Sequence, residues 1–165
     1  MLFTWRRLAI SAACIVLAAC SSKTTPDAPD SGPVNEPEPD GGTVSCSTEP
    51  GLDTYVANLT KPGKAGLTFT LVSSDPAPPA RGTNNWTLKL TDASGAPVDG
   101  ATIDIKSFMP QHGHGSSITP TISGTGGGSY TIGNVYLFMP GLWTITVTAK
   151  ATVTDSVVFT FCIPG

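Results

Sequence analysis

The chain has 165 residues, of which only 13% are charged, and its formal net charge is −3; Gly and Pro together make up one residue in five. This composition excludes a coiled coil or helical bundle, which would be rich in Ala, Glu, Lys and Leu. The negative charge excludes a nucleic-acid binder that depends on bulk electrostatics. The length suits one domain with additional segments.

Residues 1–19 have the pattern of a secretory signal peptide. Arg6 and Arg7 precede the apolar stretch 8–17, which is too short to span a bilayer stably. The stretch ends in Leu17-Ala18-Ala19-Cys20, which resembles the bacterial lipobox. The resemblance implies cleavage before Cys20 and lipid attachment to that residue, and two or more acyl chains anchor a protein stably. The alternative is a soluble secreted protein with an accidental cysteine.

We therefore expect the protein to lie in the bacterial cell envelope, anchored to a membrane through Cys20 and facing the periplasm or the exterior. Ser21 follows Cys20 at the position where an Asp commonly retains lipoproteins in the inner membrane of enteric bacteria. The serine at this position favours the outer membrane.

Residues 20–45, which follow the signal peptide, are predicted to form a disordered acidic linker. The segment 21–45 contains five prolines and five acidic residues against a single Lys23, and it has no aromatic residue. Such a chain cannot bury enough apolar surface to order itself. We expect it to be a solvated spacer between the lipid and the domain.

A disulfide is predicted between Cys46 and Cys162. After loss of Cys14 with the signal peptide and acylation of Cys20, these are the remaining thiols. An exported protein enters an oxidising compartment, where two such thiols have one possible intramolecular pairing. The bond would join the start of the domain to its last strand.

Residues 46–165 are predicted to form an all-β domain. Apolar and polar residues alternate with a period of two in several short segments, and turn sequences such as Pro140-Gly141 separate them. About seven short strands in this length indicate an immunoglobulin-like β-sandwich. We expect Trp86 and Trp143 in its core. The predicted strands include 67–71, 86–92, 101–106, 118–123, 130–138, 143–150 and 157–161.

Methionine and histidine are concentrated in a short part of this domain. Met109, His112 and His114 fall within six residues, and Met139 lies in Phe-Met-Pro, a tripeptide that also contains Met109. If consecutive strands pair antiparallel, both tripeptides end strands at the same end of the sandwich. The two methionines could then meet there, with the histidines on the intervening loop.

Copper is the metal that this set of residues suits. Thioether sulfur is a soft donor that selects Cu(I), and imidazole serves both copper oxidation states. We therefore predict a copper site, with Cu(I) favoured, made by Met109, His112, His114 and Met139. The alternative is a polar, Gly-rich loop above a methionine that closes the end of the core.

Residues 86–161 resemble the YtkA-like domain, which is related to FixH-like proteins. The resemblance is carried by Gly95-Ala96-Pro97-Val98, by 109–114, by Gly128-Ser129-Tyr130 and by 139–143. It implies a small extracytoplasmic β-sandwich, linked in some members to copper handling or cytochrome oxidase assembly. This chain differs from FixH in its predicted lipid anchor and in having no predicted transmembrane helix.

The sequence thus predicts a lipoprotein that buffers, delivers or senses copper, with a copper-donating or copper-receiving protein as partner. The alternative is an immunoglobulin-like envelope module that binds protein or polysaccharide without a metal. We do not expect an enzyme: Ser116 or Ser117 with His112 and Asp155 could be imagined as a triad, but no nucleophile elbow accompanies them. No small-molecule substrate is identified.

Overall fold

The structure is a computed structural model, and it describes residue 49 and residues 51–165. The predicted signal peptide (1–19), the predicted linker (20–45), Cys20 and Cys46 lie outside the described residues. Within the described part the chain forms nine strands and no helix. The strands are β1 (Leu59–Pro62), β2 (Thr68–Asp75), β3 (Gly82–Thr91), β4 (Thr102–Met109), β5 (His114–Gly115), β6 (Thr121–Gly126), β7 (Ser129–Leu137), β8 (Gly141–Lys150) and β9 (Thr154–Ile163).

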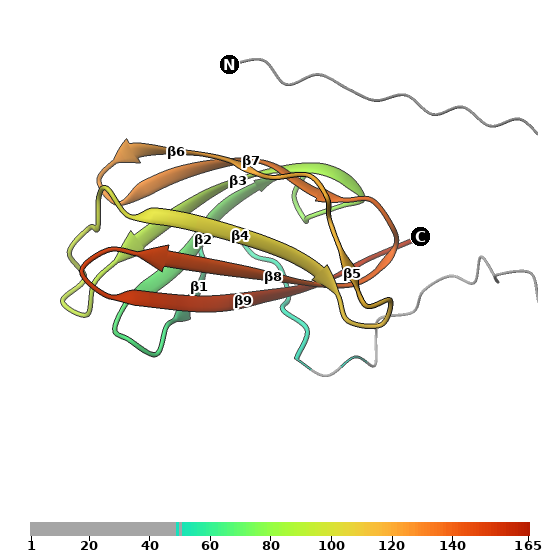
Figure 1. The fold of residues 1–165 in the computed structure, drawn as a ribbon, viewed down its shortest axis with the longest axis horizontal. Coiled ribbons are helices and arrows are strands. Elements are labelled where there is room, and N and C mark those ends of the chain that lie inside the picture. Colours follow the sequence, from blue (N-terminus) through green and yellow to red (C-terminus); the bar gives the residue numbers. More distant parts are fainter. Residues whose placement is uncertain (1–48, 50) are drawn as a thin grey trace, which may run out of the picture. The chain divides into compact units, whose positions relative to one another are not determined.

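The strands form two antiparallel sheets that enclose one apolar core (Figure 1). The five-stranded sheet has the order β1-β2-β3-β7-β6, and the four-stranded sheet has the order β5-β4-β8-β9. Alternate residues of the central strands face inward, as the period-two pattern predicted. Trp86 and Trp143 are buried in this core, which confirms their predicted placement.

The β-sandwich prediction is confirmed, although the domain has nine strands where about seven were expected. The two short strands explain the difference: β1 has four residues and β5 only two, too few to show a period. The predicted strand 118–123 instead begins at Thr121, as β6. Pro120 directly precedes it, and the backbone N–H that proline lacks cannot contribute to a sheet ladder.

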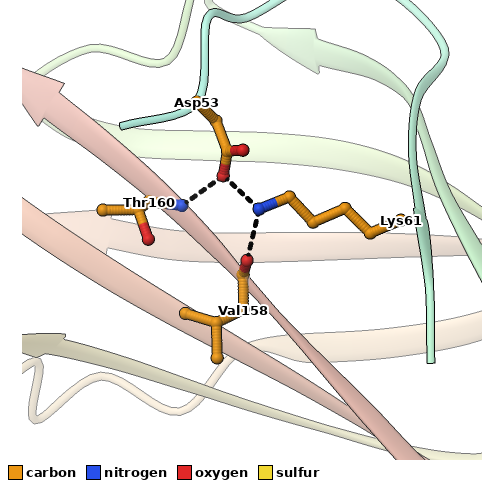
Figure 2. A network of polar contacts seen from close by, with 4 residues as sticks. All are labelled: Asp53, Lys61, Val158 and Thr160. Carbon is orange, nitrogen blue, oxygen red and sulfur yellow. Dashed lines mark hydrogen bonds and ion pairs between the residues drawn. The ribbon is translucent and has the colours of Figure 1, made fainter. Parts of the chain in front are cut away.

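A network of polar contacts attaches the chain before β1 to β9, the outer strand of the smaller sheet (Figure 2). One carboxylate oxygen of Asp53 accepts hydrogen bonds from the Lys61 ammonium at 2.6 Å and from the Thr160 backbone N–H at 2.7 Å. The same ammonium donates to the Val158 carbonyl at 2.7 Å. Lys61 belongs to β1 in the other sheet, so the network links the two sheets and covers part of an exposed edge.

The order of the strands places two chain segments at one end of the sandwich. β4 runs antiparallel to β8, with Phe108 of β4 opposite Thr144 near the start of β8. β7 ends at Leu137 and the chain enters β8 at Gly141, so the end of β4 and the β7–β8 connection lie at the same pole (Figure 1). Both Phe-Met-Pro tripeptides occur there, as the strand count predicted.

Candidate metal centre

The turn between β4 and β5 presents the two histidines. The Met109 carbonyl accepts hydrogen bonds from the backbone N–H groups of His112 at 3.2 Å and Gly113 at 3.0 Å. Gly113 has φ 67°, a left-handed conformation that glycine adopts without steric cost. The chain then returns along β4, where His114 pairs with Met109. The turn is therefore short and tied at both ends to the last residue of β4.

The two imidazoles lie close together on the surface. The ring centroids of His112 and His114 are 5.6 Å apart and their planes are inclined by 39°. Both side chains are exposed. Two solvent-accessible imidazoles at this separation could both bind one ion if a nitrogen of each ring turns toward it.

A row of aromatic rings continues from His114 across the same pole. His114 stacks on Phe138 with a centroid separation of 5.5 Å and an interplanar angle of 22°. Phe138 also stacks with Tyr136 at 6.1 Å and meets the buried Trp143 edge-on at 5.4 Å. Sequence reasoning missed this role of Phe138; its position one residue before Met139 was the available signal.

The two methionines occupy different environments. Met109 is fully buried at the end of the core, whereas Met139 is partly buried. The Met109 methyl group lies against Gly141, where an added Cβ would come within 2.7 Å of it. Gly141 also has φ 130°, a conformation that L side chains rarely adopt, so a larger residue there would strain the backbone and displace the Met109 methyl group.

These environments divide the four predicted ligands. His112 lies in the exposed turn after β4, and His114 follows in the two-residue strand β5. Met139 packs against the core and follows Phe138, the residue that stacks on His114. Met109 closes the end of the core, which is the situation that the alternative interpretation described. The carbonyl of Met139 accepts a hydrogen bond from the Trp143 indole N–H at 3.0 Å, which fixes the backbone of that segment. We call these four residues and their surroundings the Met–His pole.

A further contact connects the Met–His pole with the first described residue. The Gln111 side-chain amide donates to the Glu49 carboxylate at 2.6 Å. Within the described residues, no group of three or more His, Cys, Asp or Glu side chains could hold a metal ion. A metal site at this pole therefore depends on thioether sulfur as well as on the imidazole pair.

The residues considered for a catalytic triad do not converge. Asp155 pairs with Ala149 at the end of β8 that is remote from Gly141, so it lies at the opposite pole from His112. Its carboxylate accepts hydrogen bonds from backbone N–H groups, among them those of Ala65 at 2.8 Å and Leu67 at 3.0 Å. Asp155 of β9 thus holds the β1–β2 turn in place.

Burial alone would raise the pKa of Asp155, but hydrogen bonds outweigh it. The N–H groups of Leu67, Ser156, Ala65 and Lys64 all stabilise the ionised carboxylate, and the pKa of Asp155 lies below its usual value. The Asp155 carboxylate would be ionised at neutral pH even without this shift. The carboxylate serves as a fixed acceptor for the turn.

Cys162 lies on β9 and is partly buried, and its sulfur is not a free thiol. Its predicted partner, Cys46, lies outside the described residues. The Cys46–Cys162 pairing therefore stays a prediction.

Comparison with known families gives one result. A family model described as YtkA-like matches residues 61–148, which include all four residues of the predicted copper site. No curated protein and no solved structure gave a significant match. No helix in the described part of the chain has the length and apolar character needed to cross a membrane.

Proposed function

Because the chain belongs to the YtkA-like family, whose model covers more than half of it, we propose that this protein binds one copper ion at the Met–His pole. The proposed ligands are Met109, His112, His114 and Met139, with Cu(I) favoured. The donor set fits copper because two imidazoles and two thioethers combine strong nitrogen donation with soft sulfur.

The spacing of His112 and His114 carries the proposal. When each imidazole nitrogen lies about 2 Å from a shared ion, the two ring centroids are roughly 5–6 Å apart at bond angles between tetrahedral and linear. The observed centroid separation of 5.6 Å falls in this range. The separation of the two rings is therefore compatible with chelation of one ion.

The methionines would enter the site at different stages. Met139 is partly buried against the core, one residue after Phe138, so its side chain is less enclosed than that of Met109. Met109 is fully buried, and its sulfur reaches an ion only if the β4–β5 turn shifts or the ion enters the end of the core. The two imidazoles and Met139 would therefore bind the ion first, and Met109 would join them afterwards.

The cellular role follows from the proposed anchor. Lipidation at Cys20 would keep the domain at a bacterial membrane, facing the periplasm or the exterior, with the outer membrane favoured by Ser21. A tethered domain with an exposed metal loop suits copper buffering, delivery or sensing, and exchange with a copper-donating or copper-receiving protein.

A second candidate function is an envelope module that binds protein or polysaccharide without a metal. Phe108 and Ile118 are 43% and 46% exposed, and both line a hollow of about 570 Å³ over the outer face of β4 and β8. A partner could bind in this hollow and cover the two apolar side chains. This candidate needs no contribution from His112 or His114.

Titration with Cu(I) and Cu(II) separates the two candidates. Alanine at both His112 and His114 should strongly weaken the binding of both ions. Met139→Ala should weaken the binding of Cu(I) more than that of Cu(II), because the softer ion gains more from sulfur. Phe108→Ala is the matched control and should leave both affinities unchanged. Equal copper affinities in the wild type and the double histidine variant would favour the second candidate.

A further inference from the structure

We propose that Phe138 is a positioning residue that holds His114 in the orientation in which the imidazole pair meets copper; this inference rests on the proposed copper function. Phe138 lies parallel to His114 within 22°, at 5.5 Å between ring centroids. The contact joins the β7–β8 connection to the β4–β5 turn, two segments that are distant in the sequence.

Phe138 is itself held in place, so it can restrain its neighbour. It meets Trp143 edge-on at 5.4 Å, and Trp143 is fully buried and hydrogen-bonded to the Met139 carbonyl. On another side Phe138 stacks with Tyr136. His114, by contrast, is an exposed side chain on a two-residue strand. The stack on Phe138 therefore restrains the orientation of the His114 ring.

Stacking can improve metal binding in this arrangement because it reduces the ordering cost. An exposed side chain loses rotamer freedom when a metal fixes it, and pre-organisation removes part of that cost before binding. The face of His114 that lies on Phe138 is covered, while the nitrogens are on the ring edge. The stack can thus fix the imidazole without occupying its donor atoms.

The two Phe-Met-Pro tripeptides show how specific this role is. In the first, Met109 is buried and Phe108 is 43% exposed; in the second, Phe138 is partly buried against His114. The same tripeptide sequence therefore has a different role in each of the two segments. Phe108 provides a matched control, since it is also a phenylalanine at the same pole.

The experiment compares Phe138→Leu, Phe138→Tyr and Phe108→Leu in the purified protein. Copper affinity is measured by competition with a chelator, and the His114 ring-proton shifts are recorded by NMR without metal. Phe138→Leu should weaken copper binding about three- to tenfold, the size of an aromatic pair contribution. It should also remove the part of the ring-current shift that Phe138 induces at the His114 ring protons. Phe138→Tyr should restore both, and Phe108→Leu should change neither.

Two results would overturn the inference while leaving copper binding intact: wild-type affinity in Phe138→Leu, or an equal loss in Phe108→Leu. A thermal melt of each variant shows whether a loss of copper affinity comes from a general loss of folding. Phe138→Tyr tests the contact with His114 separately, because it keeps the aromatic ring. If the wild-type protein itself binds copper no better than the double histidine variant, the proposed function fails, and this inference fails with it.

Discussion

At the scale of single residues, burial separates donors that the sequence presents as equivalent. Met109 and Met139 occur in identical tripeptides, yet the first is fully buried and the second is partly exposed. The difference arises because Met109 is the last residue of β4 and faces the core, while Met139 lies in the connection between β7 and β8. One side chain therefore contributes to the core as well as to the proposed site.

Met109→Ala should destabilise the metal-free protein by about 2–4 kcal/mol, because it leaves a cavity at the end of the core. Met109→Leu keeps the volume and removes the sulfur, so it should cost less than about 1.5 kcal/mol. Chemical denaturation in the presence of a copper chelator measures both values, and Met139→Ala provides the partly exposed comparison. If Met109→Ala proves no less stable than the wild type, Met109 is not a core residue.

At the scale of elements, the strands could be predicted wherever one face is buried. The alternation of Ile145, Val147 and Ala149 with threonines identified β8, and the structure buries all three. The two-residue strand β5 could not be found in this way, because its pairing with β4 depends on the turn after Met109. The stack of His114 on Phe138 was equally hidden, since tertiary contacts between distant segments leave no periodic signal.

Asp155 connects the β1–β2 turn with β9, and this connection should depend on pH. Its pKa is depressed in the folded protein, so its contribution to stability is present above the unfolded pKa of about 3.9 and is lost as the pH falls through the lower folded value. Asp155→Asn should therefore reduce the loss of stability below about pH 4. Denaturation between acidic and neutral pH tests this, with the exposed Asp104→Asn as control. If Asp155→Asn loses as much stability below about pH 4 as the wild type does, the Asp155 carboxylate does not stabilise the turn.

At the scale of the whole molecule, the start of the described domain is tied to its last strand. The network of Asp53, Lys61 and Thr160 holds the chain before β1 against β9 (Figure 2). Cys162 lies two residues beyond Thr160 on that strand. A bond from Cys46 to Cys162 would attach the chain to the same strand again.

The Cys46–Cys162 disulfide should be present in protein isolated from an oxidising compartment. Its intact mass under non-reducing conditions should be lower by two hydrogens, and reduction should destabilise the domain by about 2–5 kcal/mol, since the bond closes a long loop. Alkylation of both cysteines in the native, unreduced protein would show that the bond does not form.

Cys20 should be the mature N-terminus and should carry lipid. Cys20→Ala should abolish lipid labelling and release the protein from membranes, because no acyl chain would then anchor it. Fractionation after expression in a bacterial host measures this outcome, and Cys14→Ala is the matched control that should remain anchored. An anchored, labelled Cys20→Ala variant would contradict the lipobox assignment.

Cu(I) competition against a chelator of known affinity tests the central claim most directly. The comparison is between the wild type and a variant with Met109→Leu, His112→Ala, His114→Ala and Met139→Leu, in which leucine preserves the core volume at Met109. The wild type should retain one Cu(I) per chain under conditions in which the variant loses it, while both proteins remain folded. Equal retention of Cu(I) by the two proteins would contradict a copper site at the Met–His pole.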